Sequence, residues 1–276
     1  MCYRGKYSRP ARQIRGKPVN ETITSRDNEK VKHACRLRDE ETRRTAEGLF
    51  FAEGPKLCLE LSAACRCTAC FATQRALDRT SELAKFDAVT WPVADHVADK
   101  LSSTKNSQQV FCLFELPHPG PEVLADARRI LALERVQDPG NVGTLIRSAA
   151  AFGFDAVLLD KGCASPFSPR TLRASMGAAA RIPVVVTQDL PAQLADLRQR
   201  GMTCLATALR GAVPLDTVGR EFAKGLCVVI GSEGQGLSDA AIDACGQAVK
   251  IPMTDRAESL NAAVAGSVLL WHFRGC

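Results

Sequence analysis

Three short stretches of this sequence place polar side chains and glycines directly after apolar runs. The first, DPGNVGTLIR (residues 138–147), follows an apolar segment and opens a helical pattern, with Asn141 as its expected N-cap. Arg147 lies opposite the apolar face of that helix, above Gly143. An arginine held over a glycine-lined loop can bind an anion or a hydroxyl. On this stretch alone, a solvated helical arginine is an equally good interpretation.

The second and third stretches have the same character. LCVVIGSEGQGL (226–237) is an apolar strand that ends at Gly231 and continues into a glycine-rich turn with Glu233. VKIPMTDRAESLN (249–261) ends a strand at a proline and presents Ser259 and Asn261 before a helix, where either residue could serve only as a cap. Neither stretch contains the dinucleotide pattern G-x-G-x-x-G or a Walker lysine, which disfavours NAD and ATP as ligands.

The elements that must position these stretches alternate regularly after residue 122. Expected strands are 129–134, 155–160, 182–187, 202–207, 226–230 and 248–251, and expected helices are 142–152, 169–177, 190–200, 238–245 and 258–273. Such alternation predicts an α/β fold with a parallel sheet covered on both faces. Ligands of these sheets bind at the carboxyl ends of the strands, where the three stretches lie.

A smaller α/β unit is expected before this sheet. Its expected strands are 49–51, 68–73, 88–91 and 109–116, and its expected helices include one with Val31, Ala34 and Leu37 on one face, one that starts at Pro55, and one near 93–101. Three prolines within residues 117–121 mark a linker, because proline fits neither a helix interior nor a central strand. The sequence therefore predicts a basic arm (1–20), a first domain (21–117) and a second domain (118–276).

Composition limits the classes of function. The 276 residues are 46% hydrophobic and 24% charged, as in globular proteins. The net charge of +6 lies in residues 1–20, which contain six basic residues and no acid. This arm suits attraction to RNA or DNA, although a solvated tail or a targeting segment has the same composition. No apolar run is long enough to cross a membrane and no apolar signal core is present, so we expect a cytoplasmic protein.

The twelve cysteines do not indicate a metal site. Cys58, Cys65, Cys67 and Cys70 are close in sequence, but they lack the paired C-x-x-C arrangement of common zinc sites. We interpret them as reduced thiols in a helix and a buried strand, and we expect no metal.

Taken together and in order, the three stretches resemble the three motifs of the SpoU branch of the SPOUT RNA methyltransferases. The segments ITSRDNEKVKHACRL and GLFFAEGPKL resemble the substrate-binding domain that precedes the catalytic domain in many members. The resemblance implies a C-terminal trefoil knot, S-adenosylmethionine as cofactor, a homodimer, and methylation of a ribose 2′-hydroxyl in structured RNA. Ribosomal RNA is the expected substrate, and the alternatives are tRNA or a catalytically silent RNA-binding or ribosome-assembly factor.

By position, the resemblance assigns cofactor binding to Gly231, Ile251 and Leu260, with Thr207 and Met253 close by. It assigns the surroundings of the reacting hydroxyl to Asn141, Arg147, Glu233, Ser259 and Asn261. Since a guanidinium stays charged, we expect Arg147 to bind a phosphate and stabilise the developing alkoxide. Asn141, Ser259 and Asn261 would orient the ribose. Glu233 would either orient Arg147 or stabilise the glycine-rich turn in which it lies.

Overall fold

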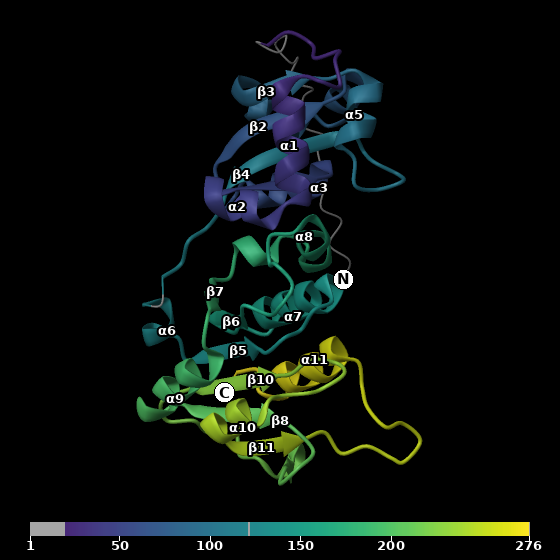
Figure 1. The fold of residues 1–276 in the computed structure, drawn as a ribbon. Helices are drawn as coiled ribbons and strands as arrows, with labels where there is room; N and C mark the ends of the chain where they lie inside the picture. The colour runs from purple at the N-terminus through teal and green to yellow at the C-terminus, as the bar shows by residue number, and fades with distance from the viewer. Residues whose placement is uncertain (1–19, 121, 276) are drawn as a thin grey trace, which may run out of the picture.

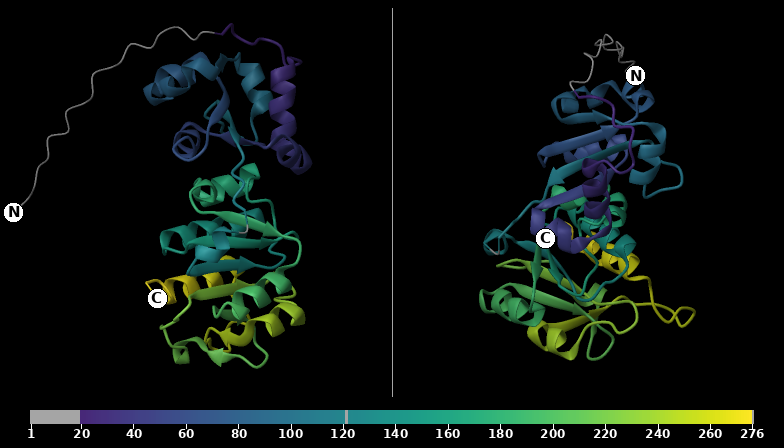
Figure 2. Two further views of the ribbon diagram at one scale, coloured as in Figure 1. Left: turned by 90° about the vertical axis from the view of Figure 1, so that its left-hand side faces the viewer. Right: turned by 45° about the horizontal axis from the view of Figure 1, so that its top comes forward.

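The computed structural model describes residues 20–120 and 122–275. Within them, the chain forms two α/β units that lie one above the other, each built on its own sheet (Figure 1). Figure 2 shows the same order of units from two further directions. The predicted basic arm lies outside the described residues except for Asn20.

The N-terminal unit has a four-stranded mixed sheet in the order β1-β4-β2-β3. Its strands are β1 (Leu49–Glu53), β2 (Cys67–Ala72), β3 (Thr90–Pro92) and β4 (Val110–Glu115). Its helices are α1 (Glu29–Asp39), α2 (Glu41–Glu47), α3 (Pro55–Leu61), α4 (Gln74–Arg79) and α5 (Asp95–Leu101), with a 3-10 segment η1 (Ser81–Val89). β4 pairs antiparallel with β1 and β2, and β3 pairs parallel with β2. As the apolar spacing predicts, α1 buries Val31, Ala34 and Leu37.

The C-terminal unit has a seven-stranded parallel sheet in the order β7-β6-β5-β10-β8-β11-β9. Its strands are β5 (Arg129–Leu133), β6 (Ala156–Asp160), β7 (Val184–Thr187), β8 (Thr203–Thr207), β9 (Val213–Pro214), β10 (Leu226–Ile230) and β11 (Gly246–Lys250). Its helices are α6 (Val123–Asp126), α7 (Pro139–Ala151), α8 (Pro169–Ser175), α9 (Leu190–Gln199), α10 (Asp239–Cys245) and α11 (Ala262–His272), with short segments η2 (Ala178–Ala180) and η3 (Leu215–Thr217). The predicted α/β fold with a parallel sheet is confirmed.

Successive residues of the strands face opposite sides of this sheet. Leu131 and Leu133 of β5 belong to the core cluster that contains α7, α8 and α11, whereas Ile130 and Ala132 belong to the cluster that contains α9 and α10. Because both faces are covered, the central strand β10 is apolar throughout, and all five residues of its LCVVI run are buried.

Two helices that carry predicted site residues begin at positions other than those predicted. Helix α7 starts at Pro139, and its N-cap is Asp138, whose carboxylate accepts a hydrogen bond from the backbone N–H of Asn141 at 2.9 Å. The prediction that Asn141 caps this helix is therefore wrong, because the preceding aspartate and proline start it earlier. Helix α11 starts at Ala262 rather than 258, with Asn261 as its N-cap.

The cysteines of the N-terminal unit are core residues. Cys58, Cys65 and Cys70 are buried, Cys67 is half-buried, and none of these four cysteines forms a disulfide. Burial raises the pKa of the Cys65 thiol, which keeps it protonated and unreactive. None of the helices in 20–120 and 122–275 has the length and apolar character that crossing a bilayer requires.

The two units contact each other through both apolar and polar side chains. The ring of Phe50 in β1 packs on that of Phe167, with centroids 5.1 Å apart. Arg181 forms an ion pair with Glu60 of α3 at 3.0 Å. These contacts give the two units a shared buried surface, and the largest core cluster includes residues of both.

Candidate functional site

The carboxyl ends of three neighbouring strands, β10, β8 and β11, open on a cavity of about 470 Å³. We call it the strand-end cavity; the turn 231–237, the segment 251–260 and the start of α11 complete its walls. The loop between β11 and α11 projects beside it from the body of the unit (Figure 1). The lining includes all five residues predicted to hold a cofactor: Thr207, Gly231, Ile251, Met253 and Leu260.

The turn 231–237 depends on glycine for its own geometry. A Cβ on Gly231 would lie 2.2 Å from the carbonyl carbon of Gly236, so a side chain there would prevent the turn from folding back. Gly236 has φ +67°, and the backbones of Ser232 and Gly236 exchange hydrogen bonds of 3.2 and 2.9 Å. These glycines therefore serve the compact turn that forms one wall of the cavity.

A buried carboxylate that the sequence analysis missed holds the end of this turn. Glu134 follows β5 and is only 6% exposed. It accepts hydrogen bonds from the backbone N–H and the hydroxyl of Ser238, each at 2.7 Å. Ser238 is the N-cap of α10, so Glu134 ties the end of β5 to the segment that leaves the turn. An acid directly after an apolar strand was the available signal.

Next to the cavity, hydrogen bonds connect all three polar stretches. The side-chain amide of Asn141 donates to the Glu233 carboxylate at 2.5 Å. The amide of Asn261 donates to the side-chain oxygen of Asn141 at 3.1 Å. Asn261 also accepts from the backbone N–H groups of Ala263 and Val264 and so fixes the start of α11. Glu233 and Ser259 line the cavity itself, so four of the five predicted catalytic residues are brought together or adjacent.

Arg147 is placed differently. It is exposed on α7, does not line the strand-end cavity, and forms no hydrogen bond or ion pair with the described residues. Glu233 bonds to Asn141 instead of orienting Arg147. The expected glycine-lined loop below Arg147 is also wrong, because Gly143 is buried against α8: a Cβ there would lie 2.6 Å from the carbonyl oxygen of Thr171.

The arrangement can hold a nucleoside-sized ligand and orient a hydroxyl beside it. Leu209, Met253 and Leu260 provide apolar walls, and the ends of the strands provide main-chain groups. In residues 20–120 and 122–275, no three or more His, Cys, Asp or Glu side chains are grouped as ligands of a metal ion would be. The polar side chains that line the cavity, among them Glu233 and Ser259, can form hydrogen bonds with a ligand and orient it.

Comparison with known proteins agrees with this geometry. Residues 128–271, just over half of the chain, match the SpoU rRNA Methylase family, and residues 28–112 match the MRM3-like substrate binding domain. The chain is 37% identical over 175 residues to the 23S rRNA (guanosine(2553)-2′-O)-methyltransferase RlmP of Bacillus subtilis, which covers 63% of this chain and 68% of that protein.

Solved structures resemble nearly the whole chain. The AdoMet-bound rRNA methyltransferase from Sinorhizobium meliloti aligns with a TM-score of 0.79 and 28% identity, covering 92% of this chain and 97% of that one. A putative RNA methyltransferase of the TrmH family from Porphyromonas gingivalis aligns with a TM-score of 0.78 and 33% identity, covering 88% and 96%. Since both the catalytic sheet and the unit before it find counterparts, this chain belongs to the SpoU rRNA Methylase family.

Proposed function

We propose that this protein transfers the methyl group of S-adenosylmethionine to a ribose 2′-hydroxyl of RNA, and that ribosomal RNA is its substrate. The observation that carries the proposal is the strand-end cavity, which all five expected cofactor residues line, with the Asn261–Asn141–Glu233 hydrogen bonds beside it. The family match and the ribosomal substrate of the Bacillus subtilis relative support it.

The residues of the strand-end cavity fit S-adenosylmethionine. A volume of about 470 Å³ is within the usual range for cofactor sites. Met253 and Leu260 would contact the adenosine, and main-chain groups of Gly231 and Ile251 would bind its polar edge. When bound, the cofactor supplies a methyl group on a sulfonium whose leaving group departs neutral, so no general acid is required.

The chain's own residues then have to align and polarise the hydroxyl. Ser259 and Asn261 would orient the ribose, while Asn141 holds Glu233 in place. Arg147 would bind the adjacent phosphate and stabilise the alkoxide as it forms. Its planar fork suits two phosphate oxygens, which a lysine would not match.

We assign a homodimer to this function, with α11 at the interface. Val264, Val268 and Trp271 are each at least 38% exposed and lie at helical spacing on one face of α11. Gly266 of the same helix packs within the subunit, because a Cβ there would lie 2.3 Å from the side chain of Leu145 in α7. A second copy would therefore cover Val264, Val268 and Trp271. That copy would also bring its own Arg147 to the site.

The two units and the N-terminal arm would have separate roles. Residues 21–117 would bind RNA and residues 118–276 would carry the knot and the reaction, a division that the two separate sheets support. The basic arm, residues 1–20, would add attraction to RNA. The protein would act in the cytoplasm.

The decisive experiment measures transfer of labelled methyl from S-adenosylmethionine to total RNA that is then separated into ribosomal and transfer fractions. We expect label in ribosomal RNA at a linkage that resists alkaline cleavage, loss of label with Arg147→Ala, and retention with Thr144→Ala, an exposed neighbour on the same helix. Label in the transfer RNA fraction would show that tRNA, and not ribosomal RNA, is the substrate. Absence of label in both fractions, together with failure to bind S-adenosylhomocysteine, would favour a catalytically silent RNA-binding factor.

A further inference from the structure

A second cavity lies entirely on the N-terminal unit. It has a volume of about 380 Å³ and shares no lining residue with the strand-end cavity. We call it the α4 cavity. It is lined by Pro55, Arg75, Ala76, Arg79, Thr80, Ser107, Gln108 and Gln109. Two arginines and no acid line it, so its charge favours an anionic ligand.

The two arginines are free to bind such a ligand. Arg75 and Arg79 are exposed and lie one turn apart on α4, so their side chains leave the helix on the same side. Neither forms a hydrogen bond or an ion pair with any residue in the described part of the chain. The nearby acid on this helix, Asp78, accepts from Gln74 at 2.8 Å. The guanidinium groups are thus available for phosphate oxygens.

The opposite wall of the α4 cavity is held in an unusual conformation. Gln109 has φ 58°, in the left-handed region that residues with side chains seldom adopt. Its backbone N–H donates to the Ser107 hydroxyl at 3.1 Å, and its side-chain oxygen accepts from the Thr73 hydroxyl at 3.1 Å. Thr73 also caps α4, so one residue fixes both walls of the cavity. The shape of the cavity is therefore set by hydrogen bonds within the protein.

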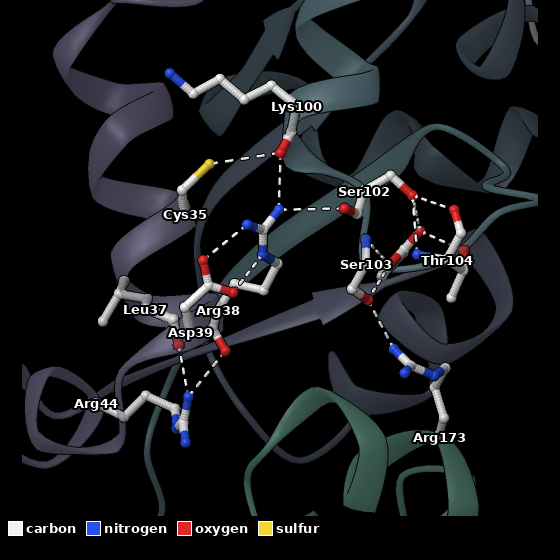
Figure 3. Close-up of polar contacts among 11 residues, drawn as sticks. Cys35, Leu37, Arg38, Asp39, Arg44, Lys100, Ser102, Ser103, Thr104 and Arg173 are labelled. Carbon is white, nitrogen blue, oxygen red and sulfur yellow. Dashed lines mark hydrogen bonds and ion pairs between the residues drawn. The ribbon is translucent and has the colours of Figure 1, made fainter.

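The same loop is anchored at its other end to a buried carboxylate. Glu53 is 6% exposed and accepts from the hydroxyls of Ser102 and Thr104 at 2.9 and 2.8 Å, and from the backbone and hydroxyl of Ser103 at 2.9 and 2.5 Å. Figure 3 shows Arg173 reaching these residues from α8 of the C-terminal unit. Its guanidinium donates to the Ser103 hydroxyl at 2.9 Å. The loop 102–109 thus connects the catalytic unit to the α4 cavity.

We propose that the α4 cavity binds one unpaired nucleotide of the RNA substrate. Arg75 and Arg79 bind its phosphates, and the side chains of Gln108, Thr80 and Ser107 bind its sugar and base by hydrogen bonds. No aromatic residue lines the cavity, so recognition rests on these polar contacts rather than on stacking. This inference rests on the proposed function, because it names where the substrate of that reaction is held.

The test compares two double variants that remove the same charge. Arg75→Ala with Arg79→Ala alters the cavity, whereas Arg36→Ala with Arg43→Ala removes two arginines of α1 and α2 that form surface ion pairs outside it. Binding of a short mixed-sequence single-stranded RNA is measured by fluorescence anisotropy over a range of salt concentrations. We expect about tenfold weaker binding for the cavity variant and a salt slope reduced by about 1.4, since each single-strand phosphate contact contributes about 0.7.

Three outcomes would overturn the proposed subsite. The two double variants could lose the same amount of RNA affinity, or the protein could bind a regular duplex as tightly as the single strand. Inorganic phosphate could also saturate the cavity with no preference for RNA. Binding of S-adenosylhomocysteine separates this proposal from the methyl transfer, because the cavity variant should leave it unchanged. A protein that fails to methylate RNA, yet needs Arg75 and Arg79 to bind it, would overturn the reaction and support the subsite.

Discussion

The side chain of Asn261 donates a hydrogen bond to the side chain of Asn141 at 3.1 Å, although 120 positions separate the two residues. The bond joins the N-cap of α11 to the first turn of α7, and Asn141 in turn donates to Glu233 after β10. Three stretches that are remote in sequence thereby become one polar unit beside the strand-end cavity. A change in one member should displace the others.

Asn141→Ala is expected to slow methyl transfer by about a hundredfold, because small displacements of orienting groups cost on that order. The substitution removes the partners of both Asn261 and Glu233. Single-turnover kinetics with saturating RNA would measure the rate. Thr144→Ala, one turn away and exposed, is the matched control. A rate close to that of the unaltered protein would show that these hydrogen bonds do not position the reacting groups.

Glu134→Gln is expected to weaken cofactor binding by about tenfold, or ~1.4 kcal/mol. The amide replaces one of the two acceptor oxygens that Ser238 requires and leaves a buried donor poorly satisfied. Calorimetric titration with S-adenosylhomocysteine would measure the change. Glu221→Gln makes the same chemical change at an exposed site and should bind normally. Unaltered cofactor affinity in both variants would show that Glu134 does not support the shape of the strand-end cavity.

Glu53→Gln is expected to destabilise the protein near neutral pH by about 1–3 kcal/mol, with the effect vanishing in acid. Burial by itself raises the pKa of Glu53, but hydrogen bonds from Ser103, Thr104 and Ser102 outweigh it, and the net pKa is lowered from 4.5. A lowered native pKa gives stability that is complete above the unfolded value and is lost as pH falls through the native one.

Urea unfolding of the Glu53→Gln variant and the unaltered protein at pH 7 and at successive values below 4.5 would test this expectation. The difference in unfolding free energy should shrink as the pH falls. Exposed Glu21→Gln is the control and should show no such difference. A gap that stays constant with pH would mean that the Glu53 charge contributes nothing.

Mixing two inactive variants is expected to restore activity. If Arg147 of one copy completes the site of the other, a dimer of an Arg147→Ala chain and a Ser259→Ala chain contains one intact site. After subunit exchange, half of the dimers are mixed, so activity should reach about a quarter of normal. Persistent inactivity, despite exchange verified by differently tagged chains, would place Arg147 and Ser259 in the same copy.

Gly143→Ala is expected to destabilise the protein by about 1–3 kcal/mol. The added Cβ would lie 2.6 Å from both the Thr171 carbonyl oxygen and the Ala174 Cβ, and the backbone atom cannot move aside cheaply. Alanine is the better helix former, so propensity alone predicts the opposite sign. Thermal unfolding would decide between them. Gly234→Ala, which meets no atom within 4 Å, should be near neutral.

Apolar runs and turn residues are local signals, so the sequence allowed the strands and the parallel sheet to be predicted. The residues expected to hold the cofactor followed from the resemblance to the SpoU methyltransferases and not from local patterns. The sequence did not indicate which side chains bond across the sheet. Asn141 had the residue type of a helix cap, yet Asp138 caps α7 and leaves the Asn141 amide to Glu233.

Roles that depend on packing between distant elements could not be predicted from the sequence either. Gly143 was interpreted from its position below Arg147 on the helix, but its neighbour α8 is known only once the helices are placed. Glu53 and Glu134 read as ordinary strand-end acids, and only their burial among hydroxyl and N–H donors distinguishes them.

The Arg173–Ser103 hydrogen bond has a consequence for how a substrate would be chosen. It connects α8 to a loop whose other end forms a wall of the α4 cavity, so the protein sets the span between that cavity and the strand-end cavity. Two binding sites at a fixed distance would select ligands by the distance between the groups that they bind. If both cavities bind the same RNA, its tertiary shape must present an unpaired nucleotide and the target ribose at that separation.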